Sequence, residues 1–218
     1  LMSQYLDFFQ NFENAVLQSK RDIEEIELIA VSKRKSIDNI LSVINEGQVS
    51  FGENQLQEII KKWPSIKDAI QKKLKLHFIG SIQSKKIHEI INQCDVIHAI
   101  DREKIIQIIS KLDKNALINK SFFIQVNTGN ESQKSGIDLK YTEEFLQLCK
   151  DYQVNINGLM CLPPENEEPD KHFQILQSLA KNNHIQNLSM GMSNDFHIAI
   201  KYGSTHIRVG SAIFGDRD

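Results

Sequence analysis

Lys33 is the residue whose position in the sequence points most directly to chemistry. It follows an apolar, β-favouring run, Leu28–Val31, after the single residue Ser32. A lysine at the end of a buried strand is partly desolvated, which lowers the pKa of its amine and makes it a nucleophile. The alternative is an ordinary solvated loop lysine beside Arg34 and Lys35, which is the commoner situation for a lysine. Lys33 therefore needs support from other parts of the chain.

Two turns in the last third of the chain are suited to hold an anion. Gly191-Met192-Ser193 follows one short apolar run, and Gly210-Ser211 follows another. Glycine lets backbone N–H groups approach an anion, and serine hydroxyls add donors. The alternative is that both are simply tight turns between a strand and a helix. A nucleophilic lysine and a phosphate-binding turn in one site are the two features that pyridoxal phosphate requires.

Arg208 is the third unusual residue, because it lies inside an apolar strand between Ile207 and Val209. A buried charge without a partner is costly, so the guanidinium needs an acceptor. A structural ion pair with Glu53 or another carboxylate would supply one. A ligand ring or anion that accepts its hydrogen bonds would supply one equally well. His77 presents a similar choice between lining the site and forming a structural hydrogen bond.

The elements that would position these residues alternate regularly between short apolar runs and longer amphipathic stretches. The expected strands are Leu28–Ser32, Val49–Phe51, Leu76–Ile79, Val96–Ile100, Phe122–Val126, Ile156–Met160, Leu188–Met190 and Ile207–Val209. About eight strand–helix units are what a (β/α)₈ barrel needs. We predict an α/β fold, a single TIM-barrel domain over residues 1–218 with an extra helix over Leu6–Ile26. A doubly wound open sheet is the alternative. A barrel would bring the strand ends, and with them the candidate residues, to one rim.

Composition excludes several other classes of function. The 218 residues carry 26 basic and 28 acidic side chains, a net charge of −2, which argues against a nucleic-acid or membrane-surface binder. No apolar run approaches the ~20 residues of a membrane span, and the N-terminus lacks a signal-peptide pattern. Cys94, Cys149 and Cys161 are widely spaced, which indicates buried thiols in a reducing compartment and no zinc site. We expect a cytoplasmic protein without a bound metal.

A series of short blocks, spread over nearly the whole chain, is similar to one known family. The blocks are Ala30–Lys33, Phe51–Asn54, His77–Gly80, Gln125–Asn127, Lys134–Gly136, Gly158–Met160, Leu188–Ser193 and Arg208–Gly210. In this order they resemble the pyridoxal phosphate homeostasis protein family. Several blocks in sequence make the resemblance specific.

The resemblance implies an alanine-racemase-like barrel that binds pyridoxal phosphate. It implies that Lys33 carries the cofactor as a Schiff base, an internal aldimine, and that Arg208 faces the pyridine nitrogen. It also implies that the two glycine- and serine-containing turns hold the phosphate. The expected cofactor-binding set is Lys33, Asn54, His77, Met192, Ser193, Arg208, Gly210 and Ser211. Members of the family have no established catalytic activity and influence vitamin B6 balance, so the implied function is intracellular cofactor homeostasis and carriage.

Two other functions remain open for such a barrel. One is a pyridoxal-phosphate-dependent amino-acid racemase or decarboxylase, and the other is a barrel that acts through protein contacts without a cofactor. Barrel racemases of this class use a tyrosine as a second base and a second, β-rich domain. The four tyrosines of this chain lie in helical or helix-flanking stretches, and the chain ends soon after the eighth strand. We therefore expect no robust turnover. We expect a monomeric carrier whose partners are pyridoxal phosphate and the apo-enzymes that accept it.

Overall fold

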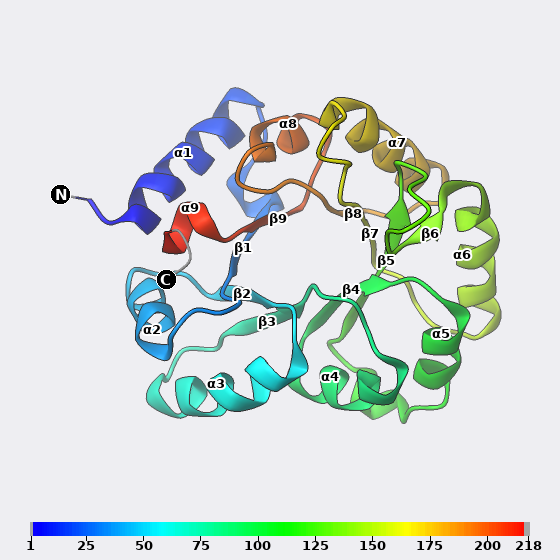
Figure 1. The fold of residues 1–218 in the computed structure, drawn as a ribbon, viewed down its shortest axis with the longest axis horizontal. Coiled ribbons are helices and arrows are strands. Elements are labelled where there is room, and N and C mark those ends of the chain that lie inside the picture. The colour runs from blue at the N-terminus through cyan, green and yellow to red at the C-terminus, as the bar shows by residue number, and fades with distance from the viewer. Residues whose placement is uncertain (1, 216–218) are drawn as a thin grey trace.

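Parallel strands form a closed ring in the structure, a computed structural model that describes residues 2–215. The ring order is β4-β3-β2-β1-β9-β8-β7-β5, and pairing of β4 with β5 closes it (Figure 1). The strands are β1 (Glu27–Val31), β2 (Ser50–Glu53), β3 (Lys75–Phe78), β4 (Val96–Ile100), β5 (Ser121–Asn127), β7 (Gly158–Met160), β8 (Asn187–Ser189) and β9 (His206–Val209). The predicted barrel is confirmed, and the open sheet is wrong because β4 and β5 pair.

A two-residue strand was not expected from the sequence. β6 (Ile137–Asp138) pairs in parallel with the end of β5, outside the ring. It follows the polar segment after β5, and two residues are too few for an alternating pattern to show.

Amphipathic helices surround the ring and cover its outer face (Figure 1). They are α2 (Ile37–Asn45), α3 (Leu56–Ala69), α4 (Ile87–Gln93), α5 (Glu103–Ser110), α6 (Thr142–Asp151), α7 (Pro169–Asn182), α8 (Phe196–Lys201) and α9 (Ser211–Phe214). Short 3₁₀ turns lie at Ile23–Glu25, Ser84–Lys86, Lys114–Leu117 and Leu139–Tyr141. The apolar faces of the helices and the outward side chains of the strands form one core, which includes the three buried, free cysteines. No helix within residues 2–215 is long and apolar enough to cross a membrane.

The extra N-terminal helix exists, but it is shorter than predicted. α1 spans Gln4–Gln18, with the Ser3 side chain accepting a hydrogen bond from the Leu6 N–H. The helix does not continue to Ile26, because Lys20 adopts a left-handed backbone conformation (φ 55°) that α-helices do not contain. α1 lies beside α8 and α9, where the Phe8 and Phe196 rings are 5.1 Å apart (Figure 1). It therefore packs against the last two helices of the ring.

Candidate cofactor-binding site

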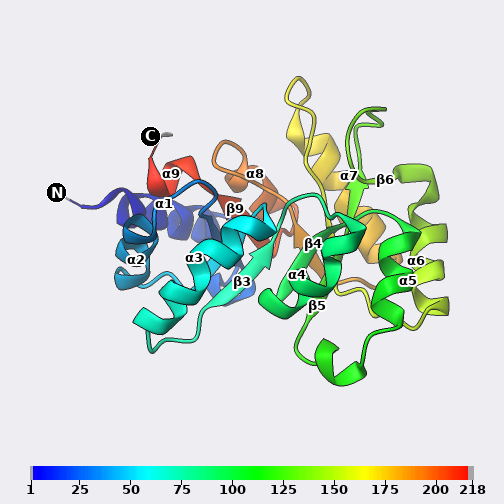
Figure 2. The ribbon, with the colours of Figure 1, turned by 60° about the horizontal axis from the view of Figure 1, so that its bottom comes forward.

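A cavity of about 1380 Å³ opens at the carboxyl ends of the strands. Its lining includes the ends of β1, β2, β7 and β9 and the segment between β8 and α8. The segments that lead into β6 and α7 project on the same side of the molecule (Figure 2). They touch each other, since a Cβ on Gly129 would lie 2.4 Å from Pro164 Cγ. These two segments form a raised wall on one side of the cavity, which we call the rim wall (residues 128–136 and 161–168).

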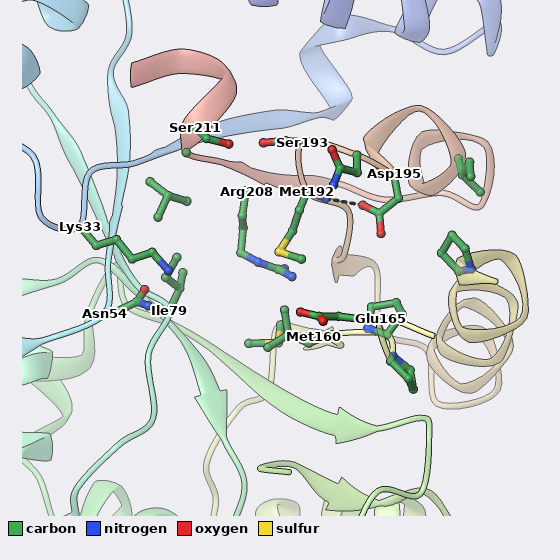
Figure 3. Close-up of a pocket in the computed structure, with 18 of the residues that line it drawn as sticks. Lys33, Asn54, Ile79, Met160, Glu165, Met192, Ser193, Asp195, Arg208 and Ser211 are labelled. Carbon is green, nitrogen blue, oxygen red and sulfur yellow. Dashed lines mark hydrogen bonds between the residues drawn. The ribbon is translucent and has the colours of Figure 1, made fainter. Parts of the chain in front are cut away.

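Lys33 extends from the end of β1 into this cavity (Figure 3). Its backbone is held on both sides. Ser32 Oγ donates to Glu53 Oε1 at 2.7 Å, the Ser32 carbonyl accepts from Lys62 Nζ at 2.9 Å, and the Arg34 N–H donates to Glu58 Oε1. The Lys33 side chain is exposed, so the expectation of partial desolvation is wrong for this structure. Among residues 2–215, no hydrogen-bond or ion-pair partner occupies its amine, which leaves Nζ available to a ligand.

The support beneath Lys33 is a buried ion pair that sequence reasoning missed. Glu53 Oε1 accepts from Lys62 Nζ at 2.7 Å and from Trp63 Nε1 at 3.2 Å. Burial raises the pKa of Glu53, and the Lys62 ammonium opposes that rise. A signal was present in the sequence: Lys62 lies on the apolar face of α3, next to Trp63 and four residues after Glu58. A lysine on such a face needs a buried acidic partner.

Arg208 reaches the cavity from inside β9, and only 4% of its surface is exposed. It donates to Ser189 Oγ, and through Nη2 to the Cys161 carbonyl at 3.1 Å. The predicted alternative, an ion pair with Glu53, is wrong because Glu53 pairs with Lys62. Within the described residues no carboxylate lies in ion-pair range of Arg208. These two hydrogen bonds use only part of its five N–H groups, so donors remain for a ligand.

The two glycine- and serine-containing turns meet at one end of the cavity. Ser193 and Ser211 both line the cavity, from segments that follow the neighbouring strands β8 and β9 (Figure 3). Gly191 has a φ of +100°, and a Cβ at this position would lie 2.6 Å from the Cβ of Ala199, so both conformation and space require glycine. The Met192 N–H donates to Asp195 Oδ1 at 2.6 Å, which shapes the loop that carries Ser193. The hydroxyls are thus presented to the cavity by a defined turn.

Seven of the eight predicted site residues line this cavity. They are Lys33, Asn54, Met192, Ser193, Arg208, Gly210 and Ser211. Sequence reasoning did not select Ile79 and Met160, which follow or end strands, or the rim-wall residues Lys134 and Glu165. Their positions at or just after strand ends could have indicated Ile79 and Met160. The rim wall instead forms through the packing of two loops that lie apart in the sequence.

His77 is the exception, and its prediction as a cofactor-binding residue is corrected. Its side chain is fully buried inside the barrel and is absent from the cavity lining. Nδ1 lies 2.9 Å from His98 Nε2, and Nε2 lies 2.9 Å from Oε1 of Glu27, the first residue of β1. Side chains alternate in direction along a strand, and this one points inward near the opposite end of the ring. His77 therefore forms structural hydrogen bonds, which was the alternative to lining the site.

The charges of the cavity suit an anionic ligand. Among the described residues, five basic side chains line it (Lys33, Arg34, Lys35, Lys134 and Arg208) and three acidic ones (Glu165, Glu167 and Asp195). Asn54 Oδ1 is buried without a hydrogen-bond partner in the described structure, so it is free to accept from a donor. Within residues 2–215 no group of histidine, cysteine and acidic side chains could hold a metal ion. The site therefore suits an organic anion that reacts with an amine.

Comparison with known proteins identifies this class of barrel. The family model for the N-terminal domain of alanine racemase matches residues 10–218. A solved alanine racemase from Clostridium difficile shares the fold at 12% identity, with a TM-score of 0.68 over 93% of this chain and 55% of that chain. The barrel of this chain is thus an alanine-racemase-type barrel.

Relatives with higher sequence identity show which family within this class the chain belongs to. The pyridoxal phosphate homeostasis protein of Escherichia coli (strain K12) is 35% identical over 213 residues, 94% of this chain and 91% of that protein. The protein of that name from Schizosaccharomyces pombe is 36% identical over 218 residues, 92% of this chain and 88% of that protein. The structure of PipY from Synechococcus elongatus with pyridoxal phosphate bound has a TM-score of 0.75 and 30% identity, covering 92% and 97% of the two chains. This chain belongs to the pyridoxal phosphate homeostasis protein family.

The buried histidines predict a pH dependence of stability. Burial lowers the pKa of both His77 and His98, so below about pH 6.5 the unfolded chain binds protons that the folded barrel does not. The free energy of unfolding should be at its full value above about pH 6.5. Below that pH it should fall by up to ~1.4 kcal/mol per pH unit for each histidine. Urea unfolding between pH 7.5 and 5.5 measures this slope.

Substitutions separate this effect from other titrations. Glu27, Lys75 and Arg208 carry charge near the pair, and Glu53, with its raised pKa, adds a slope of opposite sign. The difference between wild type and His98→Gln isolates the histidine, and the slope should become shallower in that variant. His88→Gln, an exposed position on α4, is the control and should keep the wild-type slope. An unchanged slope in His98→Gln would contradict the assignment.

Proposed function

We propose that this chain binds pyridoxal phosphate in the cavity at the carboxyl ends of the strands and acts in intracellular pyridoxal phosphate homeostasis and carriage. One observation carries the proposal. The free amine of Lys33 and the buried guanidinium of Arg208 share one cavity with the hydroxyls of Ser193 and Ser211. The ligand must therefore offer a group that reacts with an amine, a hydrogen-bond acceptor and an anion. Pyridoxal phosphate has an aldehyde, a ring nitrogen and a phosphate.

The residues fit these three groups. Lys33 would hold the cofactor covalently through Nζ, and Arg208 would donate a hydrogen bond to the ring nitrogen. Ser193, Ser211 and the backbone at Met192 and Gly210 would hold the phosphate. Asn54, with its buried and unpartnered Oδ1, would face the cofactor from the end of β2. When bound, the cofactor supplies an aldehyde and an electron-withdrawing ring.

Carriage rather than turnover is supported by the character of Arg208. A guanidinium stays protonated and only donates, so the ring nitrogen opposite it must accept and remain unprotonated, which weakens electron withdrawal by the ring. In the described part of the chain no tyrosine lines the cavity, so a second base would have to come from elsewhere. Glu165 and Glu167 are the acidic residues of the rim wall that line the cavity, and Glu167 already contacts His172 Nε2 at 3.0 Å. The relatives in Escherichia coli and Schizosaccharomyces pombe are named as homeostasis proteins.

The proposal extends to location and partners. Lys33, Arg208 and both serines come from one chain, so cofactor binding needs no second subunit, in keeping with the expected monomer. Three free, buried cysteines suit a reducing compartment such as the cytoplasm. The cavity is open, which suits transfer of the cofactor to apo-enzymes.

Borohydride tests the role of Lys33. Condensation of the Lys33 amine with the cofactor aldehyde releases water, and reduction makes the bond permanent. Peptide mapping after reduction should place the cofactor on Lys33. Lys33→Ala should lose both the label and the visible absorbance of the protein. Lys134→Ala, a second cavity lysine paired with Glu131 at 2.9 Å, should keep both. Labelling of another lysine in the wild type would overturn the assignment.

Comparison of two cofactor forms tests the phosphate site. Pyridoxal, which lacks the phosphate, should bind at least about a hundredfold more weakly, because several hydrogen bonds to a charged group contribute ~1.5–3 kcal/mol each. Ser193→Ala and Ser211→Ala should weaken binding of pyridoxal phosphate but not of pyridoxal. Ser135→Ala, at an exposed serine outside the cavity lining, is the matched control. Equal affinity for the two forms would show that these turns do not bind the phosphate.

An exchange assay discriminates the carrier from a racemase. Incubation of the loaded wild type with L-alanine in D₂O should give little Cα deuteration and no D-alanine, since proton return from the face opposite Lys33 lacks a dedicated base. Rapid racemisation that is lost in both Lys33→Ala and Glu165→Gln would instead establish an enzyme. It would also make Glu165 its second acid–base group.

A further inference from the structure

A continuous row of polar side chains crosses the interior of the barrel. Arg208 donates to Ser189 Oγ, which lies 2.8 Å from His98 Nδ1. His98 Nε2 lies 2.9 Å from His77 Nδ1, and His77 Nε2 lies 2.9 Å from Glu27 Oε1. Ser189, His98 and His77 are all completely buried. Barrel interiors are usually filled by apolar, branched side chains, so this row requires an explanation.

The row connects two openings of the barrel. Arg208 lines the cavity at the carboxyl ends of the strands. Glu27, at the start of β1, lines a second cavity of about 940 Å³ that also contains Lys75 and His206. The cofactor-facing guanidinium is thereby linked to the far end of the ring.

Hydrogen-bond donors along the row can be satisfied in one consistent direction. Ser189 Oγ accepts from Arg208, so its own hydrogen is free for His98 Nδ1. His98 must then be protonated on Nε2, which donates to His77 Nδ1. His77 is protonated on Nε2 in turn and donates to the Glu27 carboxylate. In the reverse direction the Ser189 hydroxyl would have no acceptor in the described residues, which is unfavourable for a buried group.

The charges support the same direction. Burial lowers the pKa of His77 and of His98, which keeps both imidazoles neutral. Burial alone would raise the pKa of Glu27, but hydrogen bonds from His206 and His77 outweigh it and hold the pKa well below its usual range. Lys75 Nζ, at 2.9 Å, and Ser50 Oγ, at 2.6 Å, also donate to Glu27. The row therefore has a cation at one end, an anion at the other and neutral groups between.

We propose that Ser189 and His98, anchored through His77 on Glu27, are positioning residues that hold the Arg208 guanidinium for the cofactor ring. The expected effect on the affinity for pyridoxal phosphate rests on the proposed function. Arginine has several rotatable bonds, and a fixed acceptor on one side reduces the freedom lost when its other N–H groups bind a ligand. The row provides that acceptor, because His98 fixes the hydroxyl of Ser189.

Nitrogen NMR of the protein without cofactor tests the row directly. With ¹⁵N-labelled histidine, His77 and His98 should both show a protonated Nε2 and an unprotonated Nδ1 at neutral pH. The Arg208 N–H groups that donate to Ser189 Oγ and to the Cys161 carbonyl should exchange slowly with water, because these acceptors are buried. An Nδ1-protonated or charged His98 would overturn the proposal. This readout does not depend on whether the cofactor binds.

Two matched pairs of variants test the consequence. Ser189→Ala removes the acceptor of Arg208 and should weaken binding of pyridoxal phosphate roughly tenfold and speed exchange of the Arg208 N–H groups. Ser204→Ala is its control, since Ser204 is equally buried but bonds only to backbone carbonyls. Glu27→Met, at the far end of the row, should change affinity and exchange in the same direction by a smaller factor. Lys75→Met is its control, because it removes a partner of Glu27 and leaves the contact with His77.

The outcomes separate the two hypotheses. Both controls should stay within about twofold of the wild-type dissociation constant. If Ser189→Ala and Glu27→Met bind the cofactor as tightly as the controls, with unchanged Arg208 exchange, the row is merely structural and the proposal fails. If Glu27→Met does not fold, Ser189→Ala and the wild-type tautomers still decide. If the wild type itself does not bind pyridoxal phosphate, the proposed function fails, and the tautomers and Arg208 exchange still test the positioning.

Discussion

The parallel pairing of β1 with β9 is the interaction on which the site depends. Ile29 lies opposite Arg208 and Ala30 opposite Val209 in this register. It joins the first strand of the ring to the last and so brings Lys33 and Arg208, 175 positions apart in numbering, to one cavity. A slip of one residue would turn Arg208 to the other face of the sheet. Closure through β4 and β5 completes the ring and leaves no strand edge in it open.

Buried and partly buried charges are stabilised in three different ways within this ring. Glu53 and Lys62 neutralise each other beneath Lys33. Glu27 is surrounded by donors from three strands: His77 and Lys75 on β3, Ser50 on β2 and His206 on β9. Arg208 has hydrogen-bond acceptors but no carboxylate in ion-pair range among the described residues. A buried charge without a partner is costly. The unpaired Arg208 guanidinium next to a cavity is therefore best explained by a ligand that accepts its hydrogen bonds.

This arrangement is consistent with a protein that holds a reactive cofactor without using it fully. The same barrel occurs in alanine racemase, which shares the fold with this chain at low sequence identity. A donor opposite the ring nitrogen reduces the electron withdrawal on which many reactions of the cofactor depend. The exposed Lys33 and the open cavity favour entry and release. Retention and transfer would then depend on contacts that hold the cofactor, such as those of Arg208 and the serine turns.

The sequence by itself determined the class of fold and indicated seven residues that line the candidate cavity. Apolar runs of strand length, separated by amphipathic stretches, specify a parallel barrel because each strand must be covered by the helix that follows it. Lys33, Gly191 and Arg208 were recognisable because a lysine after a strand, a glycine in a tight turn and an arginine inside an apolar run are each locally unusual.

Only the tertiary structure decided the direction and the partner of each polar side chain. His77 looked like a rim residue, but its position along β3 points it inward to Glu27 and His98. The role of Lys62 is evident only from the packing of α3 on β2, which places Lys62 against Glu53. The end of α1 depended on the backbone conformation of Lys20, and the rim wall on the contact of Gly129 with Pro164. Hydrogen bonds between strands far apart in sequence depend on the register and closure of the ring, which no local pattern of residues contains.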